Sequence, residues 1–214
     1  MVSLKSMRKQ CLLPVVSLIL LCPFLVSGQT EFTNVDQFLK SILSGEARLD
    51  TKAEGDLNGD GLADWTGLIH REKTGSAPTY QLYIVLRVPQ GGYRVAVESK
   101  EEEIAGMGCC WVEDLRIERS SIYIQSNAKT AATMEAATHQ FKFYKGEWRL
   151  VGVKIYYIDH SSDVSTETDM NVLTGAIIEK RQKGDRKGTV KRRSQKFGVY
   201  LLKDFDFSNM FGTE

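Results

Sequence analysis

The sequence lacks the common arrangements of catalytic residues. It contains no Gly-x-Ser-x-Gly motif of the kind that presents a nucleophilic serine in hydrolases. It has only three histidines, and His70 and His139 each stand alone in strand-like runs. Asp159, His160 and Ser161 are sequence neighbours, and the side chains of neighbours rarely form a nucleophile–base–acid line. These absences favour a non-enzymatic protein.

Cysteines are too few for a disulfide framework. Of the four, Cys11 and Cys22 lie in an N-terminal segment that we expect to be removed, and Cys109 and Cys110 are adjacent. A bond between neighbours is strained, so the simplest interpretation is two small side chains of which at least one is buried. A vicinal disulfide or a redox pair is the alternative in an oxidising compartment.

Only one apolar run is long, and it lies at the N-terminus. A basic segment precedes residues 12–26, and Val26-Ser27-Gly28 offers small residues for cleavage. This layout predicts that residues 1–28 are a secretory signal peptide of a bacterial Sec substrate. An uncleaved anchor is the alternative, although Pro14 and Pro23 interrupt the run. We therefore expect a periplasmic or secreted protein with no transmembrane segment after cleavage.

Signal removal changes the charge balance. The signal carries three of the 28 basic residues and none of the 27 acidic ones, so the mature net charge is about −2. Residues 29–214 are enough for a single domain with a sizeable core.

The most informative stretch runs from Asp56 to Asp64. It places oxygen-bearing side chains at loop positions 1, 3, 5 and 9 and glycine at position 6, which is the spacing of a short calcium loop. An EF-hand is excluded because position 12, where that loop needs glutamate, is Gly67. A metal-free turn is the alternative, but three aspartates packed so closely repel one another without a cation.

Residues 53–65 resemble the FG-GAP/VCBS-type repeat, in which an Asn-Gly-Asp-Gly core is followed by Asp and a large apolar residue. That family places such loops between two β-strands, and the resemblance implies a Ca²⁺ site with one backbone carbonyl ligand, from Leu62. The side-chain ligands that it implies are Asp56, Asn58, Asp60 and Asp64.

The rest of the mature chain predicts a mainly β fold with one short N-terminal helix. Apolar residues recur at helical spacing in 33–43, and Gly45 follows them. Alternating strand-like runs then succeed one another about every ten residues, with turn residues between them. The pattern predicts an antiparallel sheet, a sandwich or a half-barrel in a single domain. A propeller is excluded because only one repeat motif is present.

Positive charge gathers in residues 180–196, which carry nine basic residues and one acidic residue. We predict a hairpin at about 176–201, with a turn between Gly184 and Gly188. One interpretation is a solvated edge whose lysines block pairing with other sheets. The other is a surface that binds an anionic partner through Lys191, Arg192 and Arg193.

Two functions are compatible with these features. The favoured one is an exported, calcium-stabilised, non-enzymatic binding module of the bacterial envelope, one form of which is an inhibitor or immunity protein. Its partner would be an envelope protein or an anionic envelope polymer or lipid, and nucleic acid is disfavoured. Residues 159–169 are polar and turn-rich and predict an exposed loop. The alternative function is an envelope hydrolase with carboxylates from this loop and from Asp114.

Overall fold

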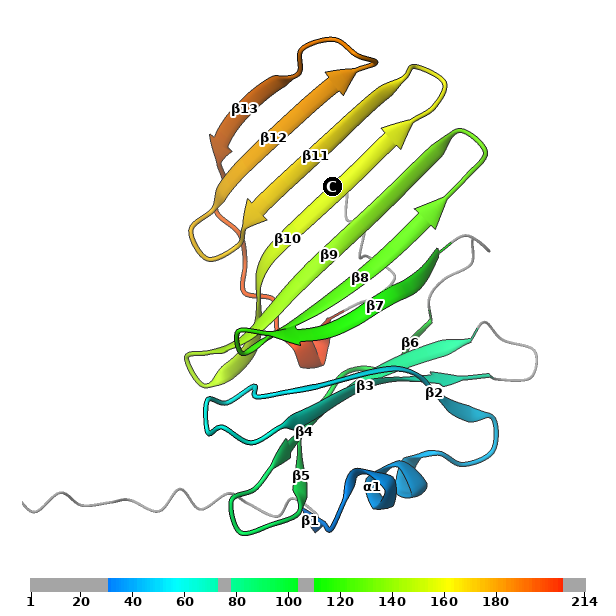
Figure 1. Ribbon diagram of the computed structural model, residues 1–214, viewed down its shortest axis with the longest axis vertical. Helices are drawn as coiled ribbons and strands as arrows, with labels where there is room; N and C mark the ends of the chain where they lie inside the picture. Colours follow the sequence, from blue (N-terminus) through cyan, green and yellow to red (C-terminus); the bar gives the residue numbers. More distant parts are fainter. Residues whose placement is uncertain (1–30, 73–77, 104–109, 206–214) are drawn as a thin grey trace, which may run out of the picture.

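The computed structural model describes residues 31–72, 78–103 and 110–205 of the protein. The predicted signal peptide and Cys109 lie outside these residues, and Cys110 is the first residue of a strand. As predicted, the described chain is mainly β with one short helix (Figure 1). Two antiparallel sheets form a single sandwich-like domain, and the strands of the described residues do not close into a barrel.

The single helix, α1 (Val35–Ile42), confirms the helical spacing of the sequence. The side-chain oxygen of Asn34 accepts a hydrogen bond from the Gln37 N–H at 2.8 Å and so caps its first turn. Phe38 is buried beneath the helix, where its ring contacts Trp65 and Tyr83. The helix therefore packs on one face of a sheet as an ordinary amphipathic element.

The N-terminal sheet has the strand order β1-β5-β4-β3-β2, with β6 paired to β4. The calcium-type loop connects β2 to β3. The six strands are β1 (Glu31–Phe32), β2 (Ala47–Gly55), β3 (Asp64–Arg71), β4 (Thr79–Arg87), β5 (Tyr93–Glu98) and β6 (Glu102–Glu103).

The C-terminal sheet is a meander of seven strands in sequence order, from β7 to β13. Its strands are β7 (Cys110–Glu118), β8 (Ser121–Lys129), β9 (Thr133–Tyr144), β10 (Glu147–Asp159), β11 (Val164–Asn171), β12 (Ala176–Lys183) and β13 (Thr189–Ser194). A short 3₁₀ turn, η1 (Leu202–Asp204), follows.

The main core lies where the two sheets face each other. Leu82 and Ile84 of β4 are fully buried there, together with Ile122 of β8 and Phe141 of β9. A second, smaller core lies between α1 and the opposite face of the N-terminal sheet. The N-terminal sheet is thus covered on both faces, which explains the continuous burial of β3 and β4.

The C-terminal sheet reaches well beyond this core (Figure 1). Burial decreases along the meander, and all six residues of β13 are exposed. We call the face that continues the core side, through Val153, Met170, Ile177 and Arg193, the core-side face, and the opposite face the outer face. Residues paired across neighbouring strands share a face, so the strand register assigns each side chain to one of the two.

Two segments differ from the prediction. Residues 164–169 belong to strand β11, so the predicted polar loop at 159–169 is reduced to a turn after Asp159. Threonines alternate with acidic residues there and pair with β10 and β12, so a polar segment forms a strand that is mostly half-buried between its two neighbours. The basic hairpin is present, but its second strand ends at Ser194, and Leu201 beyond it forms an isolated bridge to Arg149.

Candidate functional site

The loop between β2 and β3 is organised by Asp56. One of its carboxylate oxygens accepts the N–H of Gly59 at 2.7 Å and the other accepts the N–H of Gly61 at 2.9 Å. Both glycines have left-handed backbone angles, near φ +80°, as predicted for Gly61 at position 6. The hydrogen bond from Gly61 is the largest cause that lowers the pKa of Asp56. Asp56 is therefore ionised and closes the turn.

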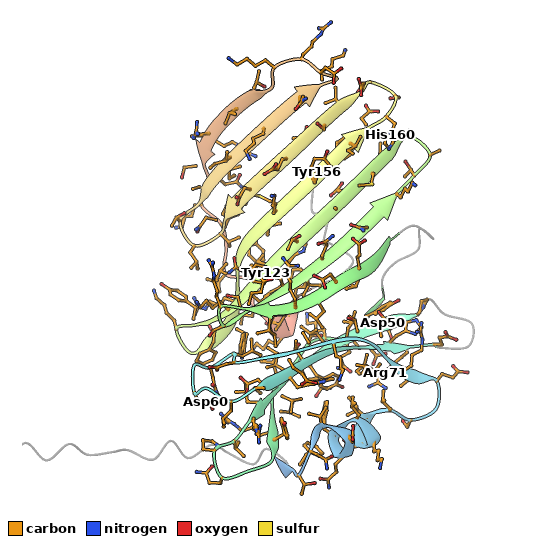
Figure 2. The ribbon with its side chains drawn as sticks, viewed as in Figure 1. Asp50, Asp60, Arg71, Tyr123, Tyr156 and His160 are labelled. Atoms are coloured by element: carbon orange, nitrogen blue, oxygen red, sulfur yellow. The ribbon has the colours of Figure 1, made fainter. Side chains whose placement is uncertain are left out.

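Asn58 and Asp60 repeat this pattern one step further along the loop. The Asn58 oxygen accepts the N–H of Asp60 at 3.0 Å, and Asp60 accepts the N–H of Leu62 at 2.8 Å. The Asn58 amide also donates to the second oxygen of Asp60 at 3.0 Å. Both side chains are exposed, and Figure 2 shows Asp60 at the end of the N-terminal sheet, far from the basic hairpin.

Asp64 has a different position, because its side chain is fully buried. One carboxylate oxygen accepts the N–H of Leu57 at 2.8 Å and the other accepts the N–H of Arg87 at 2.9 Å. The carboxylate thus ties the start of the loop to the end of β4. Burial is the largest cause that raises the pKa of Asp64, and the charges of Asp60 and Asp56 raise it further.

The donor set suits calcium in chemistry, since it consists of carboxylate, amide and carbonyl oxygens. The predicted ligands are not gathered around one point, however. Among the described residues, no group of three or more His, Cys, Asp or Glu side chains is placed to hold a metal. The side chains of Asp56, Asn58 and Asp60 accept main-chain N–H groups within the loop, whereas Asp64 accepts those of Leu57 and Arg87. If Asp64 bound a metal, it would do so in addition to this structural role.

The three cations predicted to bind an anion lie on β13, where the register divides them. Arg193 pairs with Ile177 and Lys191 pairs with Glu179, which places both on the core-side face. Arg192 pairs with Ile178 and belongs to the outer face. All three are exposed. The sequence run therefore does not form one patch, because successive side chains of a strand point to opposite faces.

The two faces of the hairpin differ in charge compensation. On the outer face, Lys154 and Lys180 both bind Glu167, at 3.2 and 3.0 Å, and these contacts lower the pKa of Glu167. On the core-side face, the strand register brings together one carboxylate, that of Glu179, and four cations that form no salt bridge with any residue in the described ranges. These are Arg181, Lys183, Lys191 and Arg193. The core-side face is consequently the more positive of the two.

The polar segment that suggested a hydrolase shows no catalytic pairing in the described chain. Asp159 accepts hydrogen bonds from the hydroxyls of Ser161 and Ser162, and these bonds lower its pKa to about 2. His160 lies at the far end of the C-terminal sheet (Figure 2). Asp159 pairs with Val164 and Glu167 pairs with Tyr156, so the two carboxylates lie on opposite faces. Asp114, on β7, binds Arg116 at 2.7 Å.

The other two histidines are buried sheet residues, as predicted. The Nδ1 atom of His70 accepts a hydrogen bond from Arg48 at 3.0 Å, and its ring packs beside Tyr80. The ring of His139 packs beside Phe205, with 5.2 Å between centroids. Neither arrangement indicates a metal ligand.

Sequence reasoning missed a cavity of about 440 Å³ at the edge of the interface between the sheets. Its walls come from four separated segments: the loop at Asn58, strands β4 and β5, the β9–β10 turn, and residues 201–203. No local motif signals it, because its residues are brought together only by the packing of the sheets.

Comparisons with known proteins assign no family to the chain. No family model, curated protein or solved structure matches it. The resemblance of residues 53–65 to the FG-GAP/VCBS-type repeat therefore stays a prediction that depends on the loop residues alone. No helix within the described ranges is long and apolar enough to span a membrane.

Proposed function

We propose that this protein is an exported, non-enzymatic binding module of the bacterial envelope that recognises an anionic partner through its basic hairpin. The observation that carries the proposal is the projection of β12 and β13 beyond the core, with four cations and a single carboxylate, that of Glu179, on their core-side face. A strand that buries none of its side chains contributes little to the core, whereas concentrated charge steers an oppositely charged partner. An inhibitor or immunity protein is one form of such a module.

The core-side face is the proposed contact surface. Its four cations have no carboxylate within salt-bridge distance among the described residues, and Arg193 donates only to the neutral Gln195 side chain, at 3.3 Å. The lysines of the outer face already share Glu167. A partner that carries several phosphates or carboxylates gains more from the core-side face, where four cations outnumber the one carboxylate.

We expect reversal of Lys191, Arg192 and Arg193 to glutamate to reduce binding to anionic vesicles or cell-wall fragments at least tenfold. Exposed charges are screened beyond about 8–10 Å at physiological ionic strength, so binding by the wild-type protein should weaken steeply with salt. Co-sedimentation at low and moderate salt measures both effects. The matched control replaces Lys40, Lys129 and Lys142 with glutamate. These three lysines are exposed and lie outside the hairpin.

A face-resolved pair of variants sharpens this test. Lys191→Glu with Arg193→Glu changes the core-side face, whereas Arg192→Glu changes the outer face. The double variant should show most of the reduction in binding that the triple variant shows. Arg192→Glu should bind nearly as the wild type does. Equal sedimentation of the wild type, the triple variant and the control would contradict the proposal and leave the hairpin a solvated sheet edge.

We also propose that Ca²⁺ stabilises the module through the β2–β3 loop. The clustered charges of Asp56, Asp60 and Asp64 support it, since the first two raise the pKa of the third. A ligand that binds only the folded state stabilises it by about 2.7 kcal/mol at a hundredfold excess over Kd.

Millimolar calcium should therefore raise the melting temperature of the wild type above its value in chelator. Asp60→Ala should remove most of the gain while leaving the melting temperature in chelator nearly unchanged, because Asp60 is exposed. Differential scanning calorimetry checks both, and equal wild-type melting temperatures in the two conditions would refute the site.

A further inference from the structure

We propose that the cavity between the two sheets binds a small amphipathic carboxylate, with an apolar body inside and its carboxylate at Arg94 and Lys203. The site is separate from the basic hairpin and does not depend on the function proposed above. A cavity of about 440 Å³ falls within the range of small-molecule sites in proteins.

The cavity wall combines apolar and polar surface in nearly equal parts. Leu86 and Val97 line it from the N-terminal sheet, and Trp148 and Leu201 line it from the other side. The ring of Phe143 lies 5.7 Å from that of Trp148 and is 51 % exposed, although Trp148 is only 6 % exposed. An exposed aromatic ring beside a buried one offers apolar surface that a ligand can cover.

Two cations line the same cavity, and one of them, Arg94, is paired across the strands with Glu31 of β1. Arg94, on β5, is half-buried, and Lys203 is exposed. Within the described chain, neither side chain forms an ion pair or a hydrogen bond. The one carboxylate in the wall, that of Glu147, already binds Arg149 at 2.7 Å. A half-buried guanidinium that lacks a partner is stabilised by a carboxylate, which it can bind with two parallel hydrogen bonds.

The position of Lys203 is set by the main chain and does not require a ligand. The N–H of Leu150 donates to the carbonyl of Tyr200 at 2.9 Å, and the N–H of Lys100 donates to the carbonyl of Lys203 at 2.9 Å. The segment is thus tied to β10 on one side and to the chain after β5 on the other. A site that is already in place loses less entropy on binding.

Three ligands with the same ten-carbon tail test the head-group preference: decanoate, decanol and decyltrimethylammonium, each below its micellar concentration. Titration followed by tryptophan fluorescence and by calorimetry should show decanoate binding at least tenfold more tightly than the other two. This comparison uses the unmodified mature protein, so it does not depend on the folding of a variant. Equal binding of decanoate and decanol, or no binding of decanoate, would overturn the proposal.

Variants then locate the head-group site. Arg94→Met with Lys203→Met should weaken decanoate binding at least tenfold, since the loss of even one charged hydrogen bond is worth roughly that factor, and should leave decanol unaffected. Lys129→Met with Lys142→Met removes the same charge elsewhere and should bind decanoate as the wild type does. An equal loss in both double variants would show that only net charge matters and would also overturn the assignment. The hairpin reversal described above should not change decanoate binding.

Discussion

Asp64→Ala is expected to destabilise the folded protein by about 2–5 kcal/mol, even in the presence of chelator. The substitution removes the acceptor of two main-chain N–H groups, those of Leu57 and Arg87, at a fully buried position. Each buried donor left without a partner costs about 1–3 kcal/mol. Urea denaturation followed by circular dichroism measures the loss.

Asp60→Ala is the matched control, because Asp60 belongs to the same loop but is exposed. In chelator it should change the free energy of unfolding by much less than Asp64→Ala does. The two variants distinguish a structural carboxylate from a calcium ligand. Loss of a structural carboxylate lowers stability in chelator, whereas loss of a ligand removes the gain in stability that calcium gives. Similar stability of Asp64→Ala and wild type in chelator would show that the buried hydrogen bonds contribute little.

The pH dependence of the difference between wild type and Asp64→Ala has a definite sign. Burial raises the pKa of Asp64 in the folded state above its ordinary value near 3.8. Between the ordinary pKa and the raised pKa, the folded state therefore binds more protons than the unfolded state does. The stability that Asp64 supplies falls as pH rises through that window. The advantage of wild type over the variant should consequently be larger below the window than above it. If the stability advantage of wild type instead increased with pH, the hydrogen bonds to Asp64 would lower its pKa by more than burial raises it.

Gly67→Ala is expected to destabilise the protein by about 3 kcal/mol, near the upper end of the usual range for overpacking a core. Gly67 lies in the centre of β3, and a Cβ atom there would be 2.1 Å from Cη2 of Trp65. The indole is fully buried and packs against Phe38 of α1. The indole cannot move without displacing the helix. Its ring occupies the space that a side chain at position 67 would need, so this position requires glycine.

Denaturant unfolding of two further variants tests that explanation. Gly198→Ala is a control at a glycine whose added Cβ would meet nothing nearer than 3.9 Å, and its stability should be nearly that of wild type. In a Trp65→Leu background the cost of Gly67→Ala should shrink, because the two positions share one space. An unchanged cost in that background would show that backbone conformation, and not the indole, requires glycine.

The predicted fold class was correct because it depended on repeated local patterns. The strand-like runs after residue 79 correspond to β4, β5 and β7 to β10, and α1 has the predicted apolar spacing. Strand β11 was missed because six of its eight residues are polar, and its two apolar residues, Val164 and Met170, stand at opposite ends of the strand and give no alternating pattern. The calcium assignment remains a prediction that its melting experiment can decide.

What the sequence determined by itself is local. The Asn34 cap, the turn closed by Asp56 with its left-handed glycines and the position of the basic hairpin each involve residues only a few positions apart, so spacing and residue type are sufficient to predict them. The tertiary structure alone decided which face each hairpin cation occupies and that the Asp64 carboxylate accepts the main-chain N–H of Arg87. It also decided that Arg94 and Trp148 line the same cavity. These relations depend on strand register and on how one sheet packs against the other. Both are set by hydrogen bonds and apolar contacts between residues far apart in the chain, and no single segment of the sequence contains them.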